Sequence, residues 1–278
     1  MINLNRIIKM GYGQLDLRKK TIIMGILNVT PDSFSDGGKY DQIDQAVEQA
    51  KKMVANGADI IDIGGESTRP GYTPVSMAEE IERIVPVIKA IKQALNVPIS
   101  IDTFKAETAK AAVEAGADII NDIWGAKYDP KIAEVAATYD VPIVLMHNRK
   151  QPQYNDLIDD MKTDLQESIA IVKGYGVKDE QIILDPGIGF AKSMEENIEA
   201  LRHLDSFKAI GYPLLLGVSR KRVVGHVLDL PIAERDEGTG AITSYGITKG
   251  VDIVRVHNVR LNARIAKMTD ALVGKGDN

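Results

Sequence analysis

GADIID, at residues 57–62, is the first of three related six-residue stretches that decide the fold. The others are GADIIN at residues 116–121 and GVDIVR at residues 250–255. In each stretch a glycine ends a helical pattern, an apolar run follows, and a polar residue stands near the end of that run. A continuous apolar run between helical patterns is typical of a parallel strand that is buried on both faces. The repeat therefore predicts strand-then-helix units whose last residue, which varies, is available for chemistry.

Eight apolar runs with helical patterns between them can be found along the chain. They are Thr21–Leu27, Ala58–Ile63, Val97–Ile101, Ala117–Ile120, Val141–Met146, Ile182–Leu184, Pro213–Gly217 and Val251–Val256. Eight consecutive units of this size close naturally into a (β/α)8 TIM barrel. An open doubly wound sheet is the alternative, but the order of units has no obvious reversal point. The predicted fold is a single α/β barrel.

The composition indicates one domain covering residues 1–278, because barrels of about 250 residues are common and no linker-like tract interrupts the chain. The first 20 residues lie outside the repeat and are expected to form a hairpin that closes the barrel bottom. A net charge of −5 argues against a general nucleic-acid binder. The sequence shows neither a membrane span nor a signal peptide. It has no cysteine, which fits a cytoplasmic protein.

Polar side chains at the ends of the predicted strands form two chemical groups. The first group is Asp102, Asn121 and Asp185, at the ends of the third, fourth and sixth strands. Because active sites of such barrels lie at the carboxyl ends of the strands, these side chains are expected to converge. Two carboxylates and an amide suit a flat heterocycle with guanidine-like N–H donors, such as an aminopyrimidinone. The alternative is an internal network, for instance Asp185 with Lys221, that only stabilises the barrel.

The second group is cationic and consists of Arg69, Arg220, Lys221, Arg255 and His257. The planar guanidinium of arginine matches phosphate oxygens bidentately, and lysine adds a point charge. Together these residues indicate a phosphorylated or diphosphorylated substrate. For any single arginine the alternative is a surface charge, and this applies especially to Arg220.

Two loops, at residues 28–38 and 64–71, are longer than ordinary strand-to-helix connections and rich in Gly, Pro, Ser and Thr. Loops of this kind can act as lids over a substrate. The alternative is a pair of surface turns with capping hydroxyls. Phe34 among polar neighbours favours a lid, because an aromatic side chain there could cover a ring.

Read together, these segments resemble dihydropteroate synthase. The matching motifs follow the family's order over nearly the whole chain, at residues 25–38, 62–71, 101–103, 120–122, 185–190, 219–221 and 255–257. The resemblance implies a TIM barrel that condenses 6-hydroxymethyl-7,8-dihydropterin diphosphate with para-aminobenzoate in folate biosynthesis. The products are 7,8-dihydropteroate and diphosphate. It further implies assistance by magnesium (Mg²⁺), a homodimeric cytoplasmic transferase, and a target of sulfonamides.

The resemblance also implies roles for individual residues. The pterin ring would be held by Asp102, Asn121, Asp185 and Lys221. The diphosphate would be held by Asn28, which would also bind magnesium, and by Thr68, Arg255 and His257. The aminobenzoate pocket would be completed by Phe34, Asp36, Arg69, Pro70 and Arg222.

The reaction can proceed without a covalent enzyme intermediate. Loss of diphosphate leaves a cation delocalised over the pterin, which Asp102 could stabilise while metal and cations stabilise the leaving group. The aniline nitrogen then attacks a cation held close and in line. The catalytic residues are therefore predicted to be Asp102, Lys221, Arg255 and His257, with Lys221 acting as a hydrogen-bond donor.

The sequence departs from the family pattern at two positions. Arg222 replaces a serine that, with its helix N-terminus, receives the aminobenzoate carboxylate; Arg222 could pair with that carboxylate or fill its pocket. Asn258 stands where an aspartate commonly follows the Arg-Val-His motif, which could change the orientation of His257. We expect Arg222 to alter affinity for para-aminobenzoate and for sulfonamides.

Three other functions remain open on the sequence alone. A catalytically altered pterin-binding paralogue or a domain like the pterin domain of corrinoid methyltransferases would also use the acidic group. The loop motifs and the cations favour the synthase, because a methyl-transfer site has no diphosphate to hold. A Schiff-base aldolase acting through Lys221 is a further alternative. Non-catalytic scaffolding is disfavoured by so many ionisable groups on one rim. Diphosphate release on mixing both substrates with magnesium discriminates among them.

Overall fold

The computed structural model describes residues 6–11, 13–29, 39–66 and 75–276. Eight parallel strands form one sheet in the order β8-β7-β6-β5-β4-β3-β10-β9. Their bounds are β3 Ile22–Asn28, β4 Ile60–Gly64, β5 Ile99–Asp102, β6 Ile119–Asp122, β7 Ile143–Met146, β8 Ile182–Asp185, β9 Leu215–Leu216 and β10 Ile253–Val256. Each lies within or beside one of the eight predicted runs. Strands β4, β5, β7, β9 and β10 are shorter than their runs, β3 and β6 equal theirs in length, and β8 is one residue longer.

The sheet closes into a barrel. The two outer strands of that order meet where the amide of Leu184 donates to the carbonyl of Pro213 at 2.9 Å and Leu184 pairs with Leu214 in a parallel bridge. A sheet that closes on itself has no free edge. The predicted (β/α)8 barrel is therefore confirmed, and the open doubly wound alternative is wrong.

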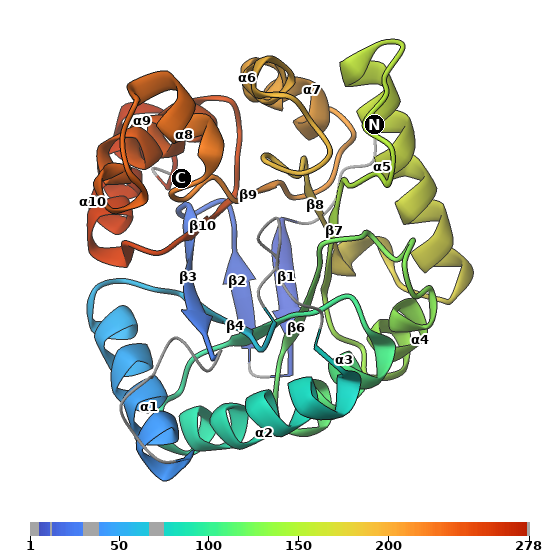
Figure 1. The fold of residues 1–278 in the computed structure, drawn as a ribbon, viewed down its shortest axis with the longest axis vertical. Helices are drawn as coiled ribbons and strands as arrows, with labels where there is room; N and C mark the ends of the chain where they lie inside the picture. The colour runs from blue at the N-terminus through green and yellow to red at the C-terminus, as the bar shows by residue number, and fades with distance from the viewer. Residues whose placement is uncertain (1–5, 12, 30–38, 67–74, 277–278) are drawn as a thin grey trace.

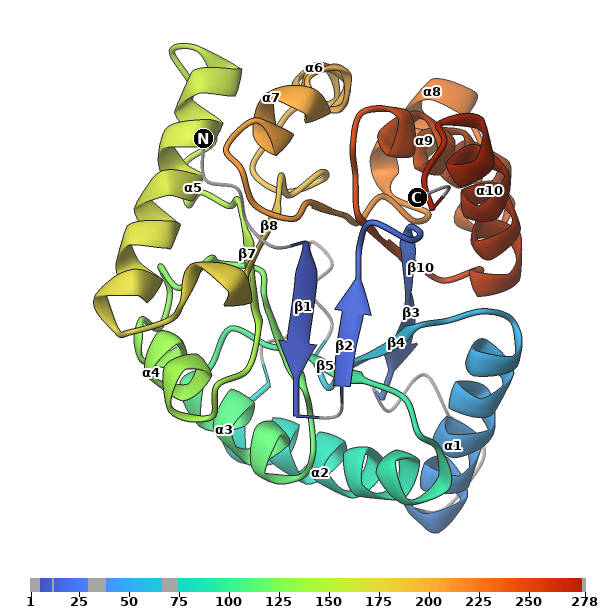
Figure 2. The same cartoon turned by 180° about the vertical axis from the view of Figure 1, so that it is seen from behind.

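Helices form a ring around the strands, as Figures 1 and 2 show from opposite sides. They are α1 Lys39–Ala55, α2 Met77–Ala94, α3 Ala106–Glu114, α4 Lys131–Thr138, α5 Leu157–Gly174, α6 Met194–Arg202, α7 Leu204–Lys208, α8 Arg222–Leu228, α9 Asp236–Thr248 and α10 Val259–Leu272. Two short 3-10 turns are η2 Asp179–Gln181 and η3 Ile232–Glu234. The reciprocal capping box of Ser193 and Glu196 begins α6. Strands buried between this ring and the barrel interior are apolar on both faces.

The aspartate in the middle of each repeat fastens its strand to the preceding neighbour in the sheet. Asp59, Asp118 and Asp252 accept the backbone N–H of a residue in or beside the adjoining strand at 3.0, 2.8 and 2.9 Å, respectively. Each also binds at least one Lys or Arg side chain. The carboxylates are buried or nearly so, and such groups need donors to offset lost hydration. The repeat thus sets the register at the amino ends of three strands.

The glycine that opens each repeat has a backbone conformation that other residues rarely adopt. Gly57, Gly116 and Gly250 have φ angles of 101°, 115° and 91°. A side chain there would also approach neighbouring atoms within 3.0–3.2 Å. Glycine therefore allows the chain to leave a helix and enter a strand in one turn.

Residues 7–16 form an antiparallel hairpin, β1 Ile7–Met10 with β2 Gly13–Asp16. In Figure 2 this hairpin lies across the middle of the helix ring. Ile8, Met10 and Leu17 are buried in one cluster with inward residues of the barrel strands, among them Ile22 and Ile253. The hairpin therefore closes the end of the barrel opposite the carboxyl ends of the strands.

Two outer positions of α10 differ from expectation. Ile265, Met268 and Leu272 follow a helical spacing that is most simply a core face, yet Met268 and Leu272 are 60% and 73% exposed. The core expectation is wrong for these two, because no other element packs beside them at that end of the helix, as far as the described residues extend. None of the helices described is long and apolar enough to cross a membrane.

Candidate active site

The last residues of the three repeats meet inside the barrel mouth. Arg255 donates from Nε to Asp62 Oδ2 at 2.6 Å, and Asn121 donates weakly to both oxygens of the same carboxylate at 3.4 Å. Asp62 is fully buried. Because equivalent residues of parallel strands point to the same interior, one repeat position builds a polar floor from three strands.

Asp102 lies beside this floor with half of its carboxylate engaged. Its Oδ2 accepts from Nη2 of Arg255 at 2.6 Å, whereas its Oδ1 is buried and has no hydrogen-bond partner in the structure. Burial raises the pKa of Asp102 to about 7, with Asp62 acting in the same direction and Arg255 opposing it. A buried acceptor without a donor is unfavourable. Asp102 Oδ1 is thus an acceptor available to a ligand N–H.

Asp185 and Lys221 face each other across Gly217. A side chain at Gly217 would lie 3.7 Å from Asp185 Oδ2 and 3.9 Å from Lys221 Nζ, so glycine leaves this space open. The other oxygen of Asp185 accepts from the amide of Gly187 at 2.7 Å. Burial raises the pKa of Asp185 and lowers that of Lys221 to about 8, while the attraction between them acts against both shifts.

Asp185 and Lys221 therefore attract each other, but no direct hydrogen bond or ion pair joins these two described side chains, so the predicted internal network is not closed here. The Lys221 ammonium also donates to the carbonyl of Ile188 and lies 4.8 Å from the centre of the Phe190 ring. An ammonium has three donors, and an aromatic face beside it provides a surface for a stacked ring. This side of the mouth can bind a planar polar heterocycle.

Asn28 offers an amide oxygen close to Asp102. A side chain at Gly64 would lie 3.6 Å from Asn28 Oδ1 and 3.9 Å from Asp102 Oδ2. Within the described residues no group of three or more His, Asp or Glu side chains could hold a metal. Mg²⁺ typically binds few protein oxygens and takes its other ligands from phosphate and water. One amide oxygen at the mouth fits that mode of binding.

His257 follows β10 and is held by Ser219. The backbone N–H of His257 donates to Ser219 Oγ at 3.1 Å, and Nδ1 lies 2.9 Å from the same oxygen. Arg220, by contrast, binds both oxygens of Asp236 at 2.8 and 3.0 Å. Arg220 is thus paired within the chain, and it lines one cavity together with His257 and Asn258.

The two positions that depart from the family pattern have different environments. Asn258 accepts from the amide of Leu261 as the N-cap of α10 and donates to Asp236 at 2.8 Å. Arg222 is exposed at the start of α8. Its side chain makes no ion pair or hydrogen bond with another described residue. Both expectations for Arg222 concern a pocket whose loop residues lie outside the described part of the chain, so they stay predictions.

Five of the predicted site residues lie outside the described residues. They are Phe34, Asp36, Thr68, Arg69 and Pro70. Asp102, Asn121, Asp185, Lys221, Arg255 and Asn28 are brought together at one mouth, with His257 at the end of the adjoining strand.

Asp62 and Ser219 were not assigned roles from the sequence. Asp62 holds the guanidinium of Arg255, and Ser219 holds the imidazole of His257. The signal for Asp62 was present, because it occupies the same repeat position as Asn121 and Arg255. The signal for Ser219 is only its place in the matched motif at residues 219–221.

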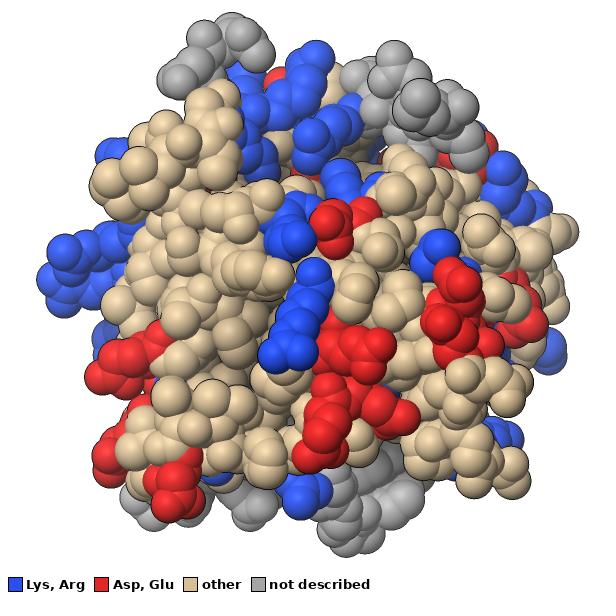
Figure 3. All heavy atoms as spheres, turned by 90° about the horizontal axis from the view of Figure 1, so that it is seen from above, with Lys and Arg blue, Asp and Glu red and all other residues tan. Residues whose placement is uncertain are grey.

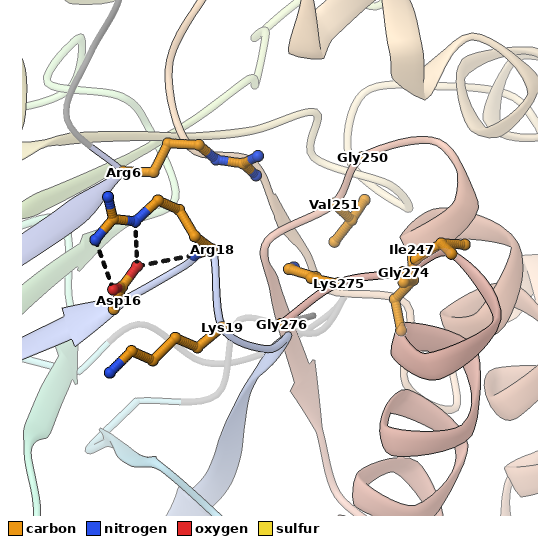
Figure 4. A pocket seen from close by; sticks show the side chains of 11 residues that line it. Arg6, Asp16, Arg18, Lys19, Ile247, Gly250, Val251, Gly274, Lys275 and Gly276 are labelled. Atoms are coloured by element: carbon orange, nitrogen blue, oxygen red, sulfur yellow. Dashed lines mark hydrogen bonds and ion pairs between the residues drawn. The ribbon is translucent and has the colours of Figure 1, made fainter. Parts of the chain in front are cut away.

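A separate cavity lies away from the mouth. A cavity of about 580 Å³ is lined by Arg6, Arg18, Lys275 and neighbours from the hairpin and the C-terminal segment. Figure 4 shows the Arg18 guanidinium turned onto Asp16, and Arg6 is paired with Asp252. The cavity contains none of the mouth residues. We assign it no part in the reaction, because its arginines are already paired where the two ends of the chain meet.

Comparisons with known proteins agree with this geometry. The model of the family described as pterin-binding enzymes matches residues 24–257. The dihydropteroate synthase of Bacillus subtilis (strain 168) is 58% identical over 275 residues, covering 99% of this chain and 96% of the relative.

Solved structures give the same result. The dihydropteroate synthase of Clostridium difficile, crystallised in the presence of pteroic acid, aligns with a TM-score of 0.91 at 52% identity, covering 93% of this chain and 98% of that one. The Yersinia pestis dihydropteroate synthase in complex with a sulfonamide drug aligns with a TM-score of 0.89 at 39% identity, covering 96% and 99%.

Proposed function

This chain belongs to the family of pterin-binding enzymes and carries out the dihydropteroate synthase reaction. We propose that the residues at its barrel mouth perform this reaction. The reaction transfers a pterinylmethyl group from 6-hydroxymethyl-7,8-dihydropterin diphosphate to para-aminobenzoate. The single observation that carries the residue assignment is the half-engaged carboxylate of Asp102, whose buried Oδ1 has no donor.

In this proposal the pterin ring supplies the missing donor. Asp102 Oδ1 accepts a ring N–H, Asn121 and Asp185 bind the aminopyrimidinone edge, and Lys221 donates to a ring heteroatom. When the bond to diphosphate breaks, positive charge spreads over the pterin. The carboxylate of Asp102 stabilises that charge because it is fixed in a low-dielectric site before the reaction begins.

The leaving diphosphate is bound on the side of Arg255, His257 and Thr68. The guanidinium of Arg255 keeps N–H donors beyond the two that bind Asp62 and Asp102, since it has five in total. Asn28 would bind magnesium together with the diphosphate, and the ion would supply charge neutralisation of the leaving group. This role rests on the neutral oxygen that Asn28 presents beside Asp102.

The amine of para-aminobenzoate attacks the exposed methylene carbon and then releases a proton. No enzyme nucleophile is needed, and Lys221 acts as a donor. Its hydrogen bond to the carbonyl of Ile188 and its attraction to Asp185 support this role over a Schiff base. The aminobenzoate pocket would include Phe34, Asp36, Arg69, Pro70 and the exposed Arg222. These assignments rest on the resemblance, and so does inhibition by sulfonamides.

We further propose a cytoplasmic homodimer. Large apolar side chains are exposed on α8, η3 and α10, at Val227, Leu228, Ile232, Met268 and Leu272. Helix α9 contacts both α8 and α10, so these elements adjoin. An exposed apolar surface of this kind is typical of a protein–protein interface. Measuring the mass in solution by light scattering tests the dimer; a monomer at micromolar concentration contradicts it.

The reaction is tested by a coupled diphosphate-release assay with and without para-aminobenzoate. We expect rapid release only with both substrates, loss of release with EDTA, and its return with magnesium. Diphosphate release that does not depend on para-aminobenzoate would identify a hydrolase, and the absence of diphosphate release would favour a pterin-binding paralogue. Borohydride trapping with a carbonyl substrate addresses the aldolase alternative; we expect no label on Lys221.

A further inference from the structure

A chain of contacts behind the pterin side of the mouth has no part in the reaction as described so far. It begins at Asp164 of α5, whose carboxylate lies 2.9 Å from Nε2 of His147, just after β7. Nδ1 of the same imidazole lies 3.0 Å from Nζ of Lys192, just before α6. The His147 side chain is fully buried. The carboxylate, imidazole and ammonium thus form one continuous hydrogen-bonded row.

The protonation states in this row follow from its environment. Burial lowers the pKa of His147 to about 4, so the imidazole is neutral near pH 7, donates from Nε2 to Asp164 and accepts at Nδ1 from Lys192. Burial acts to raise the pKa of Asp164, but the bonds from His147 and Arg149 outweigh it and keep that pKa below its usual range. Each bond of the row therefore joins a donor to an acceptor.

The row ends on the turn that carries Phe190. Nζ of Lys192 donates to the carbonyl of Phe190 at 2.9 Å, and the Phe190 ring lies 4.8 Å from Nζ of Lys221. The same turn provides the carbonyl of Ile188 that Lys221 binds. Lys192 is therefore linked, through one short turn, to the lysine expected to bind the pterin.

The two glycines of this turn lie close against their neighbours. A side chain at Gly187 would come within 2.0 Å of the His147 carbonyl, and one at Gly189 would lie 3.1 Å from Lys221. Both glycines have positive φ angles, 65° and 89°. The turn is packed between His147 on one side and Lys221 on the other, so anchoring one side positions the other.

Lys192 also brings charge to the site when it is protonated. Burial lowers the pKa of Lys192 to about 7, with Asp185, Glu196 and Asp164 acting to raise it and Lys221 acting to lower it. The ammonium form therefore prevails below pH 7, on the acidic side of the pH profile. Asp185 in turn faces Lys221, Arg255 and Lys192, together with the amide of Gly187. Removing Lys192 leaves the buried carboxylate of Asp185 with one cation fewer, which favours its protonated form.

We infer that Lys192 is a positioning residue for pterin binding: held by His147 and Asp164, it fixes the Gly187–Phe190 turn against Lys221 and helps to keep Asp185 ionised. The inference deepens the proposed function, because it concerns the pterin side of the same mouth. Lys192 itself contacts the turn and not the reacting atoms.

The test compares Lys192→Met, which removes both the donors and the charge, with Lys192→Gln, which keeps a donor. For Lys192→Met we expect the KM for the pterin diphosphate to rise about tenfold, with the KM for para-aminobenzoate and kcat within about threefold of wild type. In both variants we expect the acidic limb of the pH profile of kcat/KM to move to higher pH, because both remove the charge. The KM for the pterin diphosphate should lie closer to the wild-type value in Lys192→Gln than in Lys192→Met. The matched control is Lys162→Met, which breaks only an exposed ion pair with Asp159 on α5.

Fluorescence gives a readout of the turn. Trp124, the one tryptophan of the chain, packs with Phe190 against the cluster of Phe104, Ile123 and Met146. We expect Lys192→Met to change Trp124 emission, with little change in Lys192→Gln.

Two results overturn the inference. The first is that Lys192→Met has the wild-type KM for the pterin diphosphate and an acidic limb at the wild-type pH. The second is that the KM values for the pterin diphosphate and for para-aminobenzoate rise equally in Lys192→Met, which indicates a general loss of structure. Calorimetric binding of the pterin diphosphate alone separates this inference from the proposed function. If wild type binds the pterin diphosphate but releases no diphosphate with para-aminobenzoate, the catalytic assignment fails, and the binding constants of the variants still decide the role of Lys192.

Discussion

Nη2 of Arg255 lies 2.6 Å from Oδ2 of Asp102, so the residue expected to hold the departing phosphates is bonded to the residue expected to hold the pterin. Asp62 takes the Nε donor of the same guanidinium. Burial acts to lower the pKa of Arg255, but the two carboxylates outweigh it and raise that pKa further. The cation proposed to bind the diphosphate is therefore already shared between two acids. The proposed pterin and phosphate sites are electrostatically coupled in the ligand-free structure.

This coupling predicts a thermodynamic cycle. Arg255→Gln leaves two buried carboxylates without their cation and is expected to lower the free energy of unfolding by about 3–5 kcal/mol. Asp62→Asn in the same chain removes one of those charges, so the double variant should be less destabilised than the sum of the two single variants. Urea unfolding of the four proteins measures the coupling. Strictly additive effects would show that Arg255 and Asp62 do not interact appreciably.

Asp102 predicts a pH dependence. Its pKa in the ligand-free protein is raised to about 7. In the proposed function its ionised form stabilises the pterin cation, so activity should be lost as pH falls through 7, and kcat/KM reports this group in the free enzyme. Asp102→Asn should lower kcat/KM by about 10²–10³-fold and remove the contribution of Asp102 to that limb, which leaves the ionisation of Asp185.

The control for Asp102 is Asp122→Asn. The pKa of Asp122 is also raised to about 7 by burial, but its carboxylate binds the amides of Trp124 and Ala126, away from the mouth. The acidic limb should persist in that variant. A limb that is unchanged in Asp102→Asn would assign it entirely to another group.

Lys221 should act through hydrogen bonds. Lys221→Met removes a donor beside Asp185 and is expected to reduce kcat/KM for the pterin diphosphate by about 10²-fold, mainly through KM, because a buried charged partner is left unpaired. Steady-state kinetics measure this loss. A wild-type KM with a collapsed kcat would instead point to chemistry at the lysine nitrogen.

His147 predicts a change in stability with pH. Its folded pKa of about 4 lies below its ordinary value of 6.5, so protons bind the unfolded chain more tightly. The contribution of the neutral imidazole is complete above pH 6.5 and is lost as pH falls toward 4, by about 3 kcal/mol at 1.36 kcal/mol per unit. The stability difference between wild type and His147→Gln should shrink over this window in urea unfolding. A difference that is constant from pH 7 to 4 contradicts the assignment.

Arg222 should affect the aminobenzoate side alone. Arg222→Ser is expected to change the KM for para-aminobenzoate and the sulfonamide inhibition constant in the same direction, because both ligands would place an anionic or polar end near this exposed cation. Arg202→Ser, an exposed arginine at the end of α6, serves as control. Unchanged constants in Arg222→Ser would remove Arg222 from the pocket.

Most of the fold could be predicted from local sequence. In each repeat the glycine allows the chain to turn from a helix into a strand, and the aspartate binds a backbone N–H of the adjoining strand. The aspartate has this same role at Asp59, Asp118 and Asp252. Apolar runs between helical patterns fixed the strands, and parallel strands in a barrel place their carboxyl ends at one mouth. The convergence of Asp102, Asn121 and Asp185 followed from that rule alone.

The pairings within the mouth depended on the tertiary structure. The bond between Arg255 and Asp62 joins residues 193 positions apart, and the bond to Asp102 spans 153 positions. The hydrogen-bonded row of Asp164, His147 and Lys192 likewise joins three separate segments of the chain. The exposure of Met268 and Leu272 also depends on the tertiary structure, because it depends on what lies beside α10. The sequence by itself determined which residues stand at the strand ends, because that follows from local periodicity. Only the folded barrel decided which of them form ion pairs and hydrogen bonds with one another, because the partners are set by distance, burial and side-chain direction.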